Sequence, residues 1–164
     1  MIGKTFALLA ISLVADAVKI TTGNDPITWY STNDLYGHVL DKSTGKVKAE
    51  IPTLVEFMQP RCPTCMEWAP IWKEIAEMKD VGVYEVASFD CTDGGKNAQT
   101  CQALGATSTP TIKLYLPGEN YAESATHFLP TGTLSRDRFL TWLNPRLPET
   151  SNGGDAHLMT AQTN

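Results

Sequence analysis

The sequence has no excess of basic residues. Lysine and arginine together number 13, against 18 aspartates and glutamates, which gives a formal net charge of −5 at pH 7. Proteins that bind nucleic acid usually present a basic stripe or patch to the phosphate backbone. We therefore expect no nucleic acid among the partners. The length of 164 residues is enough for one well-buried domain and short for two, so one domain is expected.

A hydrophobic run long enough to cross a membrane is also lacking. A membrane-spanning helix needs roughly 20 apolar residues, whereas the uncharged run at residues 5–15 is about half that long. Lys4 precedes this run, and Ala15-Asp16-Ala17 places small residues where a signal peptidase reads them. We predict a signal peptide at residues 1–17, with no stable membrane insertion; the alternative is an N-terminal anchor.

Histidine and cysteine are too sparse for a structural zinc site. Such a site needs four ligands at short spacings, and the chain has one Cys-x-x-Cys pair and three scattered histidines, His38, His127 and His157. We expect no metal and no cofactor. The four cysteines all follow the predicted signal peptide, and an even number in an oxidising compartment is readily accommodated as two disulfides.

What the sequence does contain is a dithiol between an apolar strand and an amphipathic helix. Cys62 and Cys65 follow the apolar run at residues 53–57 and open a segment whose apolar residues keep helical spacing. The first cysteine would lie at a helix N-terminus, where free N–H groups and the helix dipole favour a thiolate. The second would return over the same turn, within reach of the first. This arrangement indicates a redox-active pair.

The remaining pattern predicts strands alternating with helices. Strands are expected at residues 27–30, 53–57, 81–89, 111–116 and 125–129. Helices are expected at residues 32–41, 63–78, 98–104 and 134–143, with a loop at 42–50. This order predicts an α/β fold with a central mixed β-sheet, parallel interior strands, an antiparallel hairpin at one edge and helices on both faces. The dithiol would lie at the carboxyl end of a central strand, where open α/β sheets place their sites.

Three separated motifs resemble the thioredoxin superfamily, and within it the domains of protein disulfide isomerases. Leu54-Val55-Glu56-Phe57 leads into the dithiol, and Pro70 lies five residues past Cys65. Thr109-Pro110-Thr111-Ile112-Lys113 looks like the loop that holds the family's cis-proline. The resemblance covers about residues 27–147 and implies a thioredoxin fold within a domain at 18–148. Residues 149–164 are polar and weakly patterned, and a disordered tail is expected there.

The resemblance implies a catalytic role for three residues. Cys62 would be the nucleophile, and Cys65 would be the buried resolving thiol that attacks Cys62 to free the substrate. Glu56 lies in an otherwise apolar strand, so its carboxyl should have a raised pKa suited to relaying a proton to or from Cys65. The plainer interpretations are a structural Cys62–Cys65 disulfide and an edge-exposed glutamate.

The same resemblance implies a substrate-binding surface around the dithiol. Pro110 would be cis and would expose the backbone of Thr109 to an extended substrate segment. Arg61, Pro63 and Thr64, next to the cysteines, would also contact substrate. Pro63 equally suits the first position of any helix, and an ordinary trans proline at a strand start is the alternative for Pro110.

Several positions depart from the family pattern. Arg61 and Met66 stand where a tryptophan and a lysine commonly flank the dithiol, and Ser88 stands where isomerase domains have a lysine facing the buried acid. Arg136 is close to the usual place of an arginine before the last helix. The pair Pro63-Thr64 differs from the Gly-His of isomerases and the Gly-Pro of thioredoxins, and this intervening pair tunes the redox potential.

The second cysteine pair is expected to be structural. Cys91 and Cys101 flank a turn and a helix just before the proline loop, a placement similar to an extra cysteine pair in some members of the isomerase family. The resemblance therefore implies a disulfide that staples this turn and helix. Trp68 and Trp72, on the helix that follows the dithiol, are most simply interpreted as core residues.

Two functions follow from these residues. The first is a thiol–disulfide oxidoreductase or isomerase that acts on protein substrates with thiols or disulfides, in the secretory pathway, either in the endoplasmic reticulum lumen or secreted. The second is a redox-inert thioredoxin-like module that binds unfolded chains or a partner protein. In that case both cysteine pairs would be structural disulfides.

Overall fold

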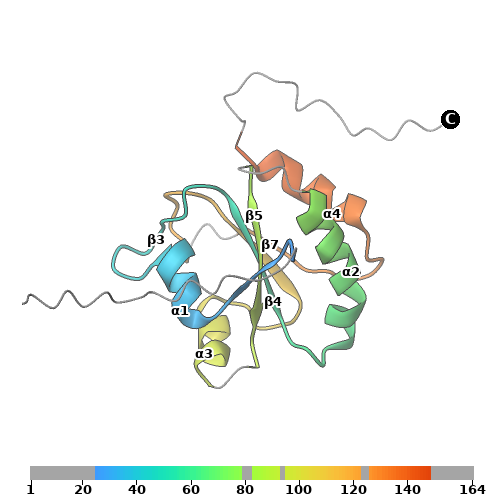
Figure 1. Ribbon diagram of the computed structural model, residues 1–164, viewed down its shortest axis with the longest axis horizontal. Helices are drawn as coiled ribbons and strands as arrows, with labels where there is room; N and C mark the ends of the chain where they lie inside the picture. The colour runs from blue at the N-terminus through green and yellow to red at the C-terminus, as the bar shows by residue number, and fades with distance from the viewer. Residues whose placement is uncertain (1–24, 79–82, 93–94, 123–125, 149–164) are drawn as a thin grey trace, which may run out of the picture.

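The computed structural model describes residues 25–78, 83–92, 95–122 and 126–148. The predicted signal peptide at residues 1–17 and the predicted tail at 149–164 lie outside these ranges. In the described part, a five-stranded sheet is covered by helices on both faces (Figure 1). None of the helices in these ranges is long and apolar enough to cross a membrane.

The five strands are arranged in the order β1-β5-β4-β6-β7. The strands β1 (Thr28–Tyr30), β5 (Glu85–Asp90) and β4 (Thr53–Met58) run parallel to one another. The strand β6 (Thr111–Tyr115) pairs antiparallel with both β4 and β7 (Thr126–Phe128). The predicted mixed sheet, with parallel interior strands and an antiparallel hairpin at one edge, is confirmed.

Helices cover the two faces of the sheet in pairs. On one side lie α2 (Pro63–Met78) and α4 (Arg136–Leu143), and on the other lie α1 (Thr32–Asp34) and α3 (Lys96–Ala103) (Figure 1). The helix α2 presents a buried stripe at helical spacing to the sheet, as its sequence predicts. This stripe consists of Cys65, Trp68, Trp72, Ile75 and Ala76.

The central strand β4 separates two apolar cores. Leu54 packs in the core beneath α2 and α4, whereas Val55 and Phe57 pack in the core beneath α1 and α3. Because successive side chains of a strand point to opposite faces, Glu56 shares the face of Leu54. The acid predicted to be buried therefore lies on the side of the sheet that α2 covers.

The segment that follows β1 differs from the prediction. The expected helix ends early: α1 continues into a π-helical turn, η1 (Leu35–Val39), and the chain then forms β2 (Leu40–Asp41). The expected loop contains β3 (Lys46–Val47), which pairs antiparallel with β2. The N–H of Val47 donates to the carbonyl of Glu119 in the distant β6–β7 connection. The strands of this hairpin are only two residues long, too short to show an alternating pattern, and the contact with Glu119 joins segments far apart in the chain.

Smaller differences concern element ends. The last helix begins two residues later than predicted, because the Ser135 hydroxyl accepts the Arg138 N–H and so caps the helix. Beyond Leu143 the chain continues into a short 3-10 turn, η2 (Asn144–Arg146), with its proline at a position that needs no N–H donor. Predicted strand residues 81–82 and 125 lie outside the described ranges.

Candidate active site

The dithiol lies at the start of α2, directly after β4. The Cys62 N–H donates to the Gln59 carbonyl at 3.1 Å, and the Cys62 carbonyl accepts the Met66 N–H at 3.0 Å, the first turn of the helix. Pro63 occupies the first helical position, where a missing N–H costs nothing. The Cys62 sulfur accepts the backbone N–H of Cys65 at 3.2 Å, as a side chain at a helix N-cap does.

The two thiols have opposite properties. Both are free in the structure; Cys62 is half-buried and Cys65 is buried. Partial burial raises the pKa of Cys62, but hydrogen bonds from Cys65, Thr109 and Thr64 outweigh that effect, so the net pKa is lowered. Burial raises the pKa of Cys65 to about 11, and its hydrogen bond to Cys62 adds to the increase. Cys62 is therefore the more acidic and the more accessible of the two thiols, and Cys65 is the less acidic and the more buried.

Glu56 supplies a buried carboxyl on the same side of the sheet. It is 4 % exposed, and burial raises its pKa to about 7, while a hydrogen bond from Ser88 opposes the rise. Ser88 is directly opposite Glu56 in the pairing of β4 with β5, so it faces the buried acid. With a pKa near neutrality, this carboxyl can gain or lose a proton at ordinary pH.

The loop that contains Pro110 lies next to Cys62. The Thr109–Pro110 peptide bond is cis, and the Cys62 sulfur lies 3.4 Å from the Thr109 carbonyl oxygen. An open groove of about 380 Å³ runs beside this contact, and its lining includes the sequence-predicted residues Thr64, Thr109 and Pro110. Arg61 and Pro63 are exposed on either side of Cys62 but are not part of the lining.

Other residues of the groove were not predicted from the sequence. Glu67 comes from α2, three residues beyond Thr64 and so on the same side of the helix. Leu129 and Leu134, with the segment between them, come from the connection between β7 and α4. Glu67 could have been predicted from its spacing of three residues from Thr64 on the same helix. The connection between β7 and α4 carries no motif, and only the fold brings it to the site.

The other two cysteines form a disulfide near the loop that contains Pro110. Cys91, just after β5, is bonded to Cys101 in α3, ten residues further along the chain. The Ala106 N–H donates to the Cys101 carbonyl, which connects the disulfide to the segment leading into the loop. A second hollow, of about 300 Å³, is bordered by both cysteines and by Thr109.

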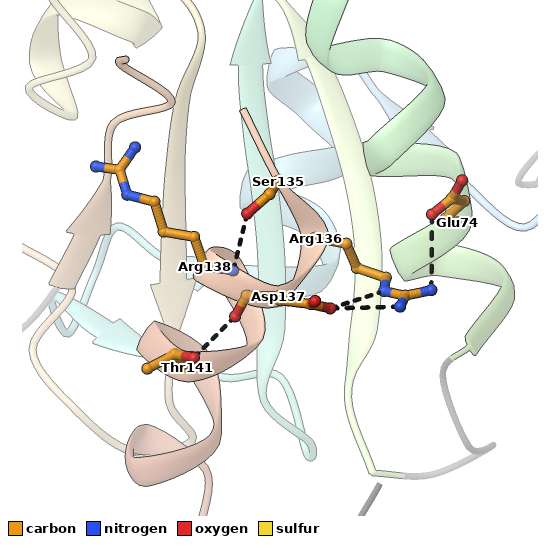
Figure 2. Close-up of polar contacts among 6 residues, drawn as sticks. All are labelled: Glu74, Ser135, Arg136, Asp137, Arg138 and Thr141. Atoms are coloured by element: carbon orange, nitrogen blue, oxygen red, sulfur yellow. Dashed lines mark hydrogen bonds and ion pairs between the residues drawn. The ribbon is translucent and has the colours of Figure 1, made fainter. Parts of the chain in front are cut away.

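Arg136 lies on the outer surface of α4, where its guanidinium contacts two carboxylates. Figure 2 shows the side chain between Glu74 of α2, at 3.9 Å, and its neighbour Asp137, at 3.3 Å. All three side chains are largely exposed, so these ion pairs stabilise little. Arg138 instead donates to the Thr131 carbonyl, beside the groove. Within the described residues, no cluster of histidine, cysteine, aspartate or glutamate could hold a metal ion.

Comparison with known proteins gives partial matches to larger proteins. The chain is 34% identical over 86 residues to sulfhydryl oxidase 1 of Gallus gallus, covering 49% of this chain and 11% of that protein. It is 36% identical over 74 residues to protein disulfide-isomerase A3 of Gallus gallus, covering 45% of this chain and 13% of that protein. The chain thus spans about an eighth or less of the length of these relatives.

Solved structures share the fold. Two thioredoxin-domain structures of ERdj5 each cover 74% of this chain with a TM-score of 0.56. The J-Trx1 fragment is 21% identical and matched over 50% of its length, and the Trx4 domain is 20% identical and matched over 96%. At these identities the likeness concerns the fold, and it confirms the predicted thioredoxin fold. The thioredoxin family model matches residues 38–137, which is more than half of the sequence, and the chain therefore belongs to the thioredoxin family.

Proposed function

We propose that this protein is a thiol–disulfide oxidoreductase that acts on protein disulfides through Cys62 and Cys65. The observation that carries the proposal is the contrast between the two thiols at the start of α2. Cys62 is accessible with a lowered pKa, and Cys65 is buried with a pKa of about 11. A pair that served only as a staple would need no such contrast. The relatives named sulfhydryl oxidase and protein disulfide-isomerase support the same class of reaction.

The reaction proceeds in two exchanges. The Cys62 thiolate attacks one sulfur of a substrate disulfide, forming a mixed disulfide and releasing the other sulfur as a thiolate that takes up a proton. Cys65 then gives its proton to the Glu56 carboxylate and attacks the Cys62 sulfur, which breaks the bond to the substrate and releases the second substrate sulfur as a thiolate that takes up a proton. The substrate gains two electrons and the dithiol loses two, becoming the Cys62–Cys65 disulfide. The reverse sequence oxidises a substrate dithiol.

The groove beside Pro110 is the proposed substrate site. Thr109 is part of its lining, and the carbonyl of this residue is 3.4 Å from the Cys62 sulfur. An extended segment lying there could hydrogen-bond to the Thr109 backbone while its disulfide reaches Cys62. Arg61, Pro63 and Thr64 would form the rim next to the attacking sulfur. The predicted signal peptide supports a location in the secretory pathway, in the endoplasmic reticulum lumen or outside the cell.

Thiol trapping in graded glutathione buffers tests the proposal. Between roughly −300 and −150 mV, Cys62 and Cys65 should pass together through one reversible two-electron transition. Mass spectrometry after alkylation would assign the transition, with Cys91 and Cys101 in the same sample as the internal control. If Cys62 and Cys65 show no transition over this range, the protein is instead a redox-inert module that binds unfolded chains or a partner.

Replacing Cys91 and Cys101 together by alanine should reduce stability more than activity. The disulfide closes a loop between residues ten apart, so its loss should lower the free energy of unfolding by on the order of 2–4 kcal/mol. Urea unfolding measures this change, and insulin reduction per folded molecule measures activity, which should be mostly retained. A loss of activity larger than the loss of folded protein would show that this pair takes part in turnover.

A further inference from the structure

A chain of hydrogen bonds connects the helix that carries the dithiol to the buried acid. The Trp72 indole Nε1 in α2 donates to the Ser88 hydroxyl at 3.0 Å, and the Ser88 hydroxyl lies 3.0 Å from Glu56 Oε2. Ser88 and Trp72 are each 1 % exposed and Glu56 is 4 % exposed. These contacts are therefore sheltered from water. In the protein interior a hydrogen bond is stronger than in water, and a buried polar group without a partner is costly.

The chemistry of the three groups fixes the direction of this chain. An indole N–H can only donate, so Ser88 must accept from Trp72. The single hydroxyl proton of Ser88 then points toward Glu56, as the geometry has it. A donor aimed at a carboxyl oxygen favours the ionised form over the protonated form. Trp72 thus does more than fill the core, because its N–H occupies one lone pair of the Ser88 hydroxyl and holds that hydroxyl where its proton points toward Glu56.

The other groups around Glu56 do not duplicate this contact. On β6, Ile112 is opposite Glu56, and the neighbouring Lys113 points to the other face of the sheet. Asp90, two residues beyond Ser88, accepts from the N–H and hydroxyl of Thr92. Among the described residues, the remaining titratable or charged groups on the elements packed over this face, or at their surface, are Cys62, Cys65, Glu67, Lys73, Glu74, Glu77, Tyr84, Arg136, Asp137, Arg138 and Arg146.

We propose that Ser88 and Trp72 are positioning residues that hold the Glu56 carboxylate and set the pH range over which it accepts the proton of Cys65. The inference rests on the proposed function, because it assigns a control to one step of that reaction. The sequence has a serine where isomerase domains have a lysine facing this acid. In this chain the neutral hydroxyl of Ser88, held in place by the Trp72 indole, stabilises the Glu56 carboxylate.

Ser88→Ala tests the first half of the pair. Without the donor, the carboxylate loses stabilisation, so the midpoint of mixed-disulfide resolution should move upward by about one pH unit. At pH 7 resolution should then be about fivefold slower, whereas well above the new midpoint it should match the unsubstituted protein. Stopped-flow kinetics from pH 5 to pH 9 measures the profile. An unchanged midpoint would overturn the proposal, and a uniform slowing at every pH would do the same, since it would indicate a structural effect only.

Two tryptophans in α2 supply a matched pair of variants. Trp72→Phe removes the donor to Ser88, which frees the hydroxyl to turn away, so the midpoint should move upward by less than in Ser88→Ala. Trp68→Phe makes the same change at an equally buried position, but the Trp68 Nε1 has no hydrogen-bond partner among the described residues. Its midpoint should stay unchanged. Equal shifts in the two variants would contradict the proposed role of Trp72.

Carbon-13 NMR of the Glu56 carboxyl separates this proposal from the proposed function. The titration of that carboxyl in the reduced protein requires no substrate and no thiol exchange. If the titration midpoint of Glu56 moves upward in Ser88→Ala and in Trp72→Phe and stays unchanged in Trp68→Phe, the positioning role is supported even if the dithiol proves inert. Unchanged midpoints in an enzyme that still exchanges thiols would reject the positioning role and leave the proposed function standing.

Discussion

The Cys62→Ser variant is expected to lose insulin-reducing activity down to the uncatalysed background. The hydroxyl that replaces the sulfur cannot attack a disulfide, and Cys65 cannot substitute, because it is buried with a pKa of about 11. At neutral pH almost none of the Cys65 thiol is ionised, so its rate of attack on a substrate is negligible. The measurement is the turbidity of reduced insulin, with circular dichroism to show that the variant is folded.

The Cys65→Ser variant is expected to behave differently, although it also stops turnover. Cys62 keeps its place at the start of α2 and its contacts with Thr109, so it should still attack substrate. The mixed disulfide should then accumulate, because no resolving thiol remains. Non-reducing mass spectrometry should find covalent adducts in Cys65→Ser and none in Cys62→Ser. Equal adducts in both variants would contradict the assignment of Cys62 as the nucleophile.

Glu56→Gln is expected to slow release of the mixed disulfide by on the order of 100-fold near neutral pH. The amide cannot accept a proton, so Cys65 must lose its proton to solvent. Initial attack by Cys62 does not require this step and should change little. The release rate of the unsubstituted protein should level off above pH 7, where Glu56 is ionised. In the variant it should keep rising toward the Cys65 pKa of about 11.

Rapid mixing separates attack from release in this variant. Glu77→Gln is a matched control, because it removes the same charge from the exposed side of α2. This control should leave both rates unchanged. If release in Glu56→Gln is the same as in the unsubstituted protein between roughly pH 6 and 8, the proton-relay role of Glu56 is rejected.

The same variant should change how stability depends on pH. The pKa of Glu56 is raised from 4.5 to about 7, so the folded protein holds a proton that the unfolded chain releases. The resulting stability is fully present below about pH 4.5 and is lost as the pH rises through 7. The loss is about 3 kcal/mol, at about 1.4 kcal/mol for each unit of pKa. Glu56→Gln should lack this slope, and urea unfolding at pH 4.5 and pH 8 measures it.

The sequence by itself determined the local architecture of the site. Residues 54, 55 and 57 are apolar and are followed within a few positions by Cys62, Pro63 and the helical pattern of α2. These residues are close together in the sequence, so local propensity was enough to predict the site's backbone. It placed the strand β4, one thiol at the start of α2 and a second thiol one turn later. The same local pattern gave the burial of Glu56, because a strand that is apolar on both faces is covered on both.

Only the tertiary structure decided the contacts between distant parts of the chain. The contact of the β2–β3 hairpin with the β6–β7 connection and the lining of the groove by Leu129 and Leu134 depend on loops that carry no periodic pattern. The ion pair of Arg136 with Glu74 depends on how α4 packs beside α2. Trp72 follows the spacing of a core residue, and nothing local indicates that its Nε1 meets Ser88. That contact exists because the register of β5 against β4 sets Ser88 beside Glu56 and the packing of α2 brings the indole to Ser88. Strand register and helix packing are determined by the whole sheet, whereas local propensity is determined by a few neighbouring residues.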